Sequence, residues 1–271
     1  MTQFHQIFPL RKPIVGMIAL PPLPGYPEFT RMDEYIERAL GDLDTLQRGG
    51  VDGVCVENDY DHPHTLTAGP EIVAPFTRIA GEVARAASVP VGLEVLLNDW
   101  RASLAIALAV GAQFIRMDFF VDRVRIKAGV IEPEPEAVLA FRARIKAEHV
   151  ALFTDVQVKY SESLEPGKRL ASSVQQAMAH GADAVIVSGQ ATGSRPTLAD
   201  VEEARAAAGM FPVLLGSGVA PDNARELLAI TEGALVGTAL KDGTEAHHRP
   251  VLARVQRLMD AVRPLRGESG R

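Results

Sequence analysis

The sequence predicts a single domain, residues 1–271, folded as a closed (β/α)8 barrel. Three observations predict it. Short apolar runs alternate with helical patterns eight times, and such alternation gives a parallel sheet with right-handed crossovers. The chain length is usual for one TIM barrel. The last two apolar runs end in small residues, Gly216-Ser217-Gly218 and Gly237-Thr238, which are typical of phosphate-binding loops after strands seven and eight.

The first half of the chain supplies four predicted strands and three predicted helices. The predicted strands are the apolar runs at residues 14–20, 54–57, 91–96 and 114–118. The predicted helices are residues 32–47, residues 71–87, and a third that ends at Val110. The proline-rich segment 21–29 cannot continue a central strand because proline lacks an N–H donor. Asn98 and Asp99 are suitable caps for the third helix.

The second half repeats the pattern after a long connection, residues 119–135, which carries Arg123, Arg125 and Lys127 and is predicted to be a lid or a substrate-facing loop. The predicted strands are residues 150–158, 184–187, 212–215 and 234–236. The predicted helices are residues 136–148, 169–180, one beginning after Thr197, 224–230 and 250–262. Thr197 and Asp200 loosely resemble a capping box. Residues 1–12 are interpreted as an N-terminal extension and residues 263–271 as a fraying polar tail.

An alternative fold is an open, doubly wound sheet. No G-x-G-x-x-G pattern follows the first strand, which argues against a dinucleotide-binding fold. The formal net charge of -6 gives no indication of a nucleic-acid-binding surface. One cysteine, Cys55, excludes a disulfide within the chain. Without a signal-peptide pattern or an apolar run of about 20 residues, we expect a cytoplasmic protein with no membrane span.

The small residues after strands seven and eight are the predicted phosphate site. Glycine lets the backbone approach a ligand closely, and such loops offer free N–H groups to an anion. We therefore expect Gly216, Ser217, Gly218, Gly237 and Thr238 to bind phosphate. Thr192, after strand six, is a further candidate. The alternative is two tight turns that hold no ligand.

Charged residues near the carboxyl ends of four strands are the predicted catalytic groups. Glu57, Glu94, Asp118 and Asp155 would form a carboxylate cluster if they point inward, and crowded carboxylates raise one another's pKa values. The cluster could hold a divalent metal, Mg²⁺ or Mn²⁺. Alternatively, Arg116 and Lys159 neutralise it as an ion-paired barrel core.

Strand alternation places some of these side chains together. It predicts that Arg116 and Asp118 share a face, and that Asp155, Gln157 and Lys159 share another. Lys159 could bind phosphate or substrate, pair with Asp155, or form a Schiff base, in that order of preference.

Several segments resemble the BtpA/SgcQ family, which is named after a photosystem I biogenesis protein of cyanobacteria. They are VGMIALPPLPGYP, GVDGVCVEN, AVGAQFIRMDFF, FTDVQVKY, ADAVIVSGQATG, LLGSGVAPDN and LVGTALK. The resemblance implies the barrel and the phosphate site. By position, the motif residues of the family correspond in this chain to Glu57, Asn58, Asp155, Lys159, Ser188, Thr192, Ser217, Gly218, Gly237 and Thr238. Where the family often has histidines, this chain has Gln157 and Tyr160.

Two functions follow as hypotheses. The first is an enzyme that acts on a small phosphorylated metabolite, such as a phosphosugar, by isomerisation or aldol-type cleavage. Asp155 would be the base, and Lys159 would bind or polarise the substrate; Glu57, Glu94 or Asp118 would be the second acid. Asn58, Arg116 and Ser188 complete the predicted binding set.

The second hypothesis is a non-enzymatic factor for the biogenesis of a membrane complex, docking through the proline-rich segment 21–29. That segment could instead be a lid over the barrel mouth. Strand-end carboxylates have no obvious role in a scaffold, so we favour the enzyme. A homo-oligomer is compatible with either function.

Overall fold

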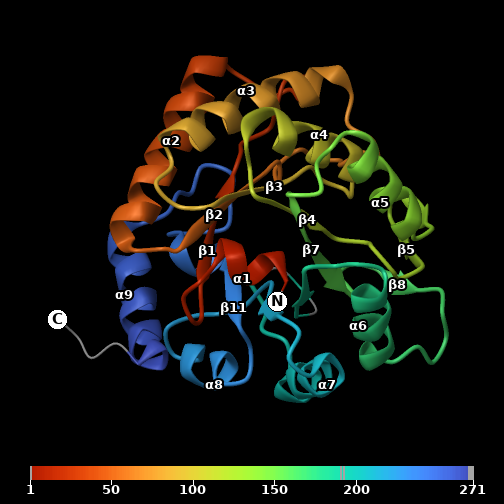
Figure 1. The fold of residues 1–271 in the computed structure, drawn as a ribbon. Coiled ribbons are helices and arrows are strands. Elements are labelled where there is room, and N and C mark those ends of the chain that lie inside the picture. The colour runs from red at the N-terminus through yellow and green to blue at the C-terminus, as the bar shows by residue number, and fades with distance from the viewer. Residues whose placement is uncertain (1, 190, 192, 268–271) are drawn as a thin grey trace.

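Eight parallel strands close into a barrel with helices on its outside (Figure 1). The computed structural model describes residues 2–189, 191 and 193–267. The order around the barrel is β1-β11-β10-β9-β7-β4-β3-β2, and β1 pairs with both β2 and β11. The strands are β1 Ile14–Ala19, β2 Gly53–Glu57, β3 Val91–Glu94, β4 Phe114–Met117, β7 Ala151–Val156, β9 Ala184–Val187, β10 Val213–Leu215 and β11 Gly233–Val236. The predicted TIM barrel is confirmed.

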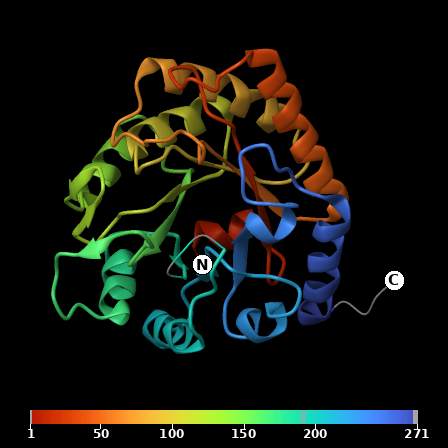
Figure 2. The same cartoon turned by 180° about the vertical axis from the view of Figure 1, so that it is seen from behind.

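The predicted helices surround this barrel (Figure 2). They are α2 Met32–Gly49, α3 Pro70–Ala86, α4 Trp100–Val110, α5 Pro135–Arg144, α6 Leu170–Ala179, α7 Leu198–Ala208, α8 Ala224–Leu228 and α9 Leu252–Val262. The Thr197–Asp200 capping box is complete, because each side chain accepts a hydrogen bond from the other residue's backbone N–H. Aspartate therefore substitutes for the usual glutamate at the third helical position.

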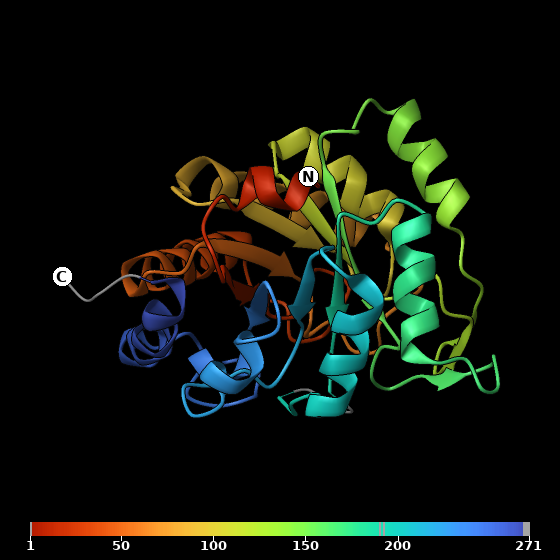
Figure 3. The ribbon, with the colours of Figure 1, turned by 60° about the horizontal axis from the view of Figure 1, so that its bottom comes forward.

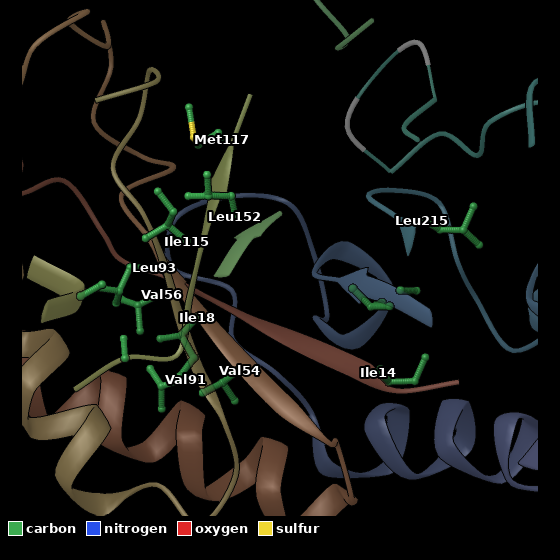
Figure 4. Close-up of a cluster of buried hydrophobic side chains, with 14 of the residues drawn as sticks. Ile14, Ile18, Val54, Val56, Val91, Leu93, Ile115, Met117, Leu152 and Leu215 are labelled. Atoms are coloured by element: carbon green, nitrogen blue, oxygen red, sulfur yellow. The ribbon is translucent and has the colours of Figure 1, made fainter. Parts of the chain in front are cut away.

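Alternation along each strand sorts the side chains into two cores. Ile14 and Ile18 of β1 pack outward against the helices, in the cluster that Figure 4 shows. Val15 and Met17 of the same strand point into the barrel. On β4 and β7, Phe114 and Phe153 point inward in the same way. The next inward positions along these two strands, Arg116 and Asp155, are charged and lie nearer the strand ends.

The N-terminal extension forms a helix, α1 Gln3–Ile7, that the sequence analysis did not predict. It lies across one end of the barrel (Figures 1 and 3). Phe4 and Phe8 are buried, with ring centroids 5.7 Å from Phe153 and 6.1 Å from Phe114, respectively. These aromatic rings close the end of the barrel at which the strands begin. Two phenylalanines four residues apart were the available signal in the sequence.

The long connection 119–135 is more ordered than a loop. It forms strands β5 Val124–Ile126 and β6 Gly129–Ile131, which pair with β8 Glu162–Ser163 in a small antiparallel sheet. Phe119, Val124, Ile131 and Val158 form a separate apolar cluster. This connection is thus held in place by its own small apolar core.

Two predicted boundaries differ from the structure, and the first of them affects the site. β7 ends at Val156, and Gln157 has a φ of 47°. Gln157 is therefore exposed, and its amide donates to the Lys168 carbonyl oxygen at 3.1 Å instead of pointing into the barrel with Asp155. The predicted tail begins as an ordered 3-10 helix, η2 Arg263–Arg266, in which Arg266 pairs with Asp52. In the described part of the chain, no helix is both long and apolar enough to cross a membrane.

Candidate active site

A cavity of about 310 Å³ opens at the carboxyl ends of the barrel strands. Its ionisable side chains are Glu57, Asp59, Tyr60, Arg116, Lys159 and Lys241. Small residues after β10 and β11 form another part of its wall: Gly216, Ser217, Gly218, Val219, Ala220, Gly237, Thr238 and Ala239. The structure therefore brings the predicted phosphate loops together with Glu57, Arg116 and Lys159.

In the loop after β10, one position requires glycine. Gly218 has a φ of +70°, and a Cβ there would lie 2.2 Å from the backbone nitrogen of Arg195. By contrast, a Cβ on Gly237 would lie 3.4 Å from its nearest neighbour, Met17. Gly218 is thus needed for the shape of the loop, whereas Gly237 leaves room for a side chain.

Four backbone N–H groups in this wall are available to a ligand. Those of Gly218, Val219, Gly237 and Thr238 donate to no other described residue. Ser217 is different, because its hydroxyl accepts from the Gly189 N–H and donates to the Ser194 carbonyl oxygen, both at 2.8 Å. Its side chain ties two loops together. Thr192 lies outside the described residues.

Arg116 occupies the middle of the predicted carboxylate cluster. Its Nε and Nη2 donate to the two oxygens of Asp155 at 2.8 and 3.1 Å, and its Nη1 donates to Glu94 at 3.2 Å. Asp118 lies 3.9 Å from Nη2. All three carboxyl groups and the guanidinium are buried or nearly so.

The ion-paired arrangement is therefore the one observed, with the guanidinium at the centre. Among the described residues, no group of three or more His, Cys, Asp or Glu side chains is placed to hold a metal ion. Strand register explains the arrangement. Leu93 pairs with Ile115, which brings the following residues, Glu94 and Arg116, side by side.

Glu94 and Asp118 both have raised pKa values. Burial raises the pKa of Glu94 well above its usual range, although Arg116 opposes this. Burial also raises the pKa of Asp118, against the effects of Arg116 and of a hydrogen bond with Glu94. Burial therefore favours the neutral forms of both carboxyl groups, whereas the Arg116 guanidinium favours their ionised forms.

Of the four predicted carboxylates, Glu57, at the end of β2, is the one that lines the cavity. Burial, and after it the charge of Asp59, raises the pKa of Glu57 to about 7, while Arg116, Lys241 and Lys159 act in the opposite direction. No described residue donates a hydrogen bond to this carboxyl group. It is therefore a titratable group near neutral pH with free lone pairs.

The other predicted carboxylates do not border the cavity. Both oxygens of Asp155 accept hydrogen bonds from Arg116, and Ser188 donates to one of them at 2.9 Å. Asn58 also lies outside the cavity wall. Its side chain donates to Asp61 and accepts from the Leu96 N–H, both at 2.8 Å, and so connects the loops after β2 and β3.

The proline-rich segment 21–29 is not a lid over this cavity, since none of its residues lines the wall. The Leu23 N–H donates to Asp61 at 2.7 Å, and the Pro22 carbonyl oxygen accepts from Tyr35 at 2.7 Å. These contacts hold it against the barrel.

Sequence reasoning missed Asp59 and Tyr60 and left Lys241 outside the predicted site. Their only signal was their position just beyond the second and eighth strands.

The fold and the position of the cavity define a TIM-barrel protein with its candidate site at the carboxyl face. A phosphoribosyl anthranilate isomerase from Thermus thermophilus has a similar fold, with a TM-score of 0.58, 13% identity and coverage of 94% of this chain and 100% of that chain. A tryptophan synthase from M. tuberculosis has a TM-score of 0.61 and 16% identity, covering 97% and 100%.

Residues 10–264 match the BtpA family, and the chain belongs to this family. It is 36% identical over 239 residues to the photosystem I biogenesis protein BtpA of Synechocystis, covering 87% of this chain and 83% of that protein. An uncharacterized protein of Pyrococcus abyssi is 35% identical over 259 residues, covering 95% and 98%. An uncharacterized mitochondrial protein of Caenorhabditis elegans is 34% identical over 264 residues, covering 94% and 95%.

Proposed function

We propose that the protein is an enzyme that moves a proton on a small phosphorylated carbonyl compound, such as a phosphosugar. The reaction class is isomerisation or aldol-type cleavage. One observation carries the proposal: Glu57, with a pKa of about 7, shares one cavity with free backbone N–H groups and with Arg116. A base, an anion-binding loop and an oxyanion-stabilising group are the parts that such chemistry needs.

The phosphate group would bind to the loops after β10 and β11. The N–H groups of Gly218, Val219, Gly237 and Thr238 supply donors that have no acceptor among the described residues. This is the usual place for phosphate in barrels of this kind. Bound there, a substrate extends across the barrel mouth.

Arg116 would stabilise the oxygen that becomes negative during the reaction. A guanidinium has five N–H donors, and Arg116 uses three of them on Asp155 and Glu94, which leaves two. In the closed ring of strands, β4 lies directly opposite β11. A substrate that is anchored by phosphate at β11 can therefore reach Arg116 with its other end.

Glu57 would be the general base. β2 lies on the arc of the barrel between β11 and β4, so its carboxylate meets the middle of a substrate that spans them. It would remove a proton from the carbon next to the carbonyl group, and the electron pair would move onto the carbonyl oxygen beside Arg116 and Lys159. Return of the proton to the former carbonyl carbon, with transfer of the proton of the adjacent hydroxyl group to the oxyanion, completes an isomerisation.

This assignment moves the base from Asp155, the residue favoured by sequence, to Glu57. Asp155 has both oxygens occupied by Arg116 and does not line the cavity. We assign it, with Ser188 behind it, the role of holding the guanidinium in place.

The comparisons support the enzyme in a general way. The isomerase from Thermus thermophilus is named for a phosphoribosyl compound. The name of the Synechocystis relative supports the alternative, a factor for photosystem I biogenesis. A nematode has no photosystem, yet the protein of Caenorhabditis elegans is 34% identical to this chain, and the match covers 95% of the nematode protein. In the described part of the chain, the six large exposed apolar side chains come from different parts of the sequence, so no single segment offers an apolar docking surface.

A thermal-shift screen against phosphosugars and inorganic phosphate tests the phosphate site. A ligand at about 100 times its Kd stabilises a protein by about 2.7 kcal/mol. Gly237→Asp should abolish the shift, because it places a carboxylate among the free N–H groups without a steric clash. Gly218 is unsuitable for this test because any side chain there would distort the loop.

Gly81→Asp is the matched control. It makes the same chemical change on α3, where a Cβ has 3.7 Å of room to Val110, and it should keep the ligand shift. If no phosphorylated compound stabilises the wild-type protein, or if Gly237→Asp binds as well as wild type, the phosphate site is wrong.

A further inference from the structure

Lys241 is a buried lysine that forms no ion pair with a described residue. Its exposed fraction is 7%, and it lines the cavity just after the 3-10 helix η1 Thr238–Leu240. Its Nζ has one hydrogen-bond partner among the described residues, the Tyr60 hydroxyl at 3.4 Å, which is long for such a bond. The Tyr60 ring centroid lies 5.3 Å from Nζ.

No described carboxylate lies close enough to Lys241 to form an ion pair with it. Asp42 and Glu57 are near enough to feel its charge, but neither lies within 4.0 Å of Nζ. Asp42 is already paired with Arg249 at 2.7 Å. Burying an ammonium group without a partner is costly, so proteins that do so usually bring it an anion. The cavity that Lys241 faces is the place from which that anion would come.

The neighbouring wall identifies the class of anion. Lys241 follows Gly237 and Thr238 by only a few residues, and its own N–H donates to the Thr238 carbonyl oxygen at 3.2 Å. The backbone N–H groups there are neutral donors and carry no formal charge. They satisfy the oxygens of a phosphate but leave its net charge uncompensated.

We propose that Lys241 is the counter-ion of the bound phosphate, and that the site selects a dianionic phosphate monoester over a monoanionic diester. This inference rests on the proposed phosphate site and adds a residue and a charge preference to it. Lys159, the second lysine of the wall, lies after β7, three strands away from β11 around the ring. It is therefore assigned to the reacting end of the substrate.

Tyr60 positions the ammonium group. Its hydroxyl donates to the carbonyl oxygen of Thr244 at 2.9 Å, and the carbonyl oxygen of Glu245 is a second acceptor at 3.2 Å. The oxygen lone pairs of Tyr60 remain available to Lys241. The phenol thus links the loop after β2 to the loop after η1 and keeps Nζ at the cavity wall.

Titration calorimetry with methyl phosphate and dimethyl phosphate, both at about pH 8, tests the proposal. Wild type should bind methyl phosphate and discriminate strongly against dimethyl phosphate. Lys241→Met should weaken methyl phosphate binding by about 10- to 100-fold, the range for loss of a hydrogen bond to a charged group, and should remove the discrimination. Lys127→Met removes one exposed charge outside the cavity wall and should bind as wild type does.

A second measurement separates this role from a structural one. Because methionine removes an unpaired buried charge, Lys241→Met should raise the unfolding temperature of the free protein while it reduces the stabilisation by methyl phosphate. If Lys241→Met binds methyl phosphate within about threefold of wild type, the inference is wrong while the phosphate site stands. If wild type binds neither compound, the phosphate site itself is wrong, and the inference fails with it.

Discussion

Arg116 and Asp155 form a two-point ion pair inside the barrel, with N–O distances of 2.8 and 3.1 Å. They come from adjacent strands, β4 and β7, and each lies two positions beyond a phenylalanine that fills the barrel floor. The interior thus has an aromatic layer near the beginning of the strands and a charged layer near their ends. The charged layer presents one guanidinium edge to the cavity.

The first prediction concerns catalysis by Glu57. Glu57→Gln should reduce kcat by about 10²- to 10⁴-fold, the usual contribution of a general base, on whichever phosphosugar the ligand screen identifies. Affinity for that ligand should change little, because glutamine fills the same space. Steady-state kinetics measures both quantities. Normal turnover by Glu57→Gln would remove Glu57 from the mechanism.

The second prediction concerns the pH dependence of activity. A base must be deprotonated to act, so kcat/KM of the wild-type enzyme should rise with pH around the Glu57 pKa of about 7. The residual activity of Glu57→Gln should lack this rise. A profile that is flat from about pH 6 to about pH 8 would contradict the assignment.

The third prediction concerns stability, which should change in the opposite direction. The folded-state pKa of Glu57, about 7, lies above its unfolded value of about 4.5. Between these values the folded state holds a proton that the unfolded state releases, so stability falls as pH rises. From about pH 5 to about pH 8, wild type should lose about 2 kcal/mol more unfolding free energy than Glu57→Gln, as measured by urea denaturation.

The fourth prediction separates Asp155 from Glu57. Asp155→Asn breaks the buried pair with Arg116 and should lower the unfolding free energy by about 3 kcal/mol or more. Ser188→Ala removes one neutral donor to Asp155 and should cost about 1 kcal/mol. Urea denaturation of both variants checks these values. If Asp155→Asn is as stable as wild type yet inactive, Asp155 is the base, as the sequence analysis expected.

The fifth prediction concerns α1. Phe8→Ala should lower the unfolding free energy by about 3–5 kcal/mol, because it opens a cavity beside Phe114 and Phe153. Phe8→Leu keeps most of the volume and should cost less. If both variants unfold at the wild-type temperature, α1 contributes little to closing the barrel.

The sequence anticipated most of the fold because the barrel depends on repeating local patterns. Eight alternations of apolar runs and helical segments were visible in one chain, and so were the glycines after the last two strands. What it missed lacked a local signal. The short strands β5, β6 and β8 are held by their pairing with one another, and α1 is held by the barrel floor.

Part of the cavity wall was predictable from the sequence, but the roles of its residues were not. Glu57, Glu94, Asp118 and Asp155 look alike in sequence, since each is an acidic residue near a strand end. The positive φ of Gln157 turned its side chain away from the face that it was expected to share with Asp155. Lys241 became notable only when its burial and the long distance to its one partner were seen.

The sequence by itself determined the barrel and the glycine-containing loops after its last two strands, because these follow from periodicity and from glycine. Only the tertiary structure decided which carboxylates Arg116 engages, which one faces the cavity and which lysine lacks a counter-ion. Those answers depend on the register of strands that are far apart in the chain. The free energy of a buried charge is set by its neighbours in space, which no local pattern encodes.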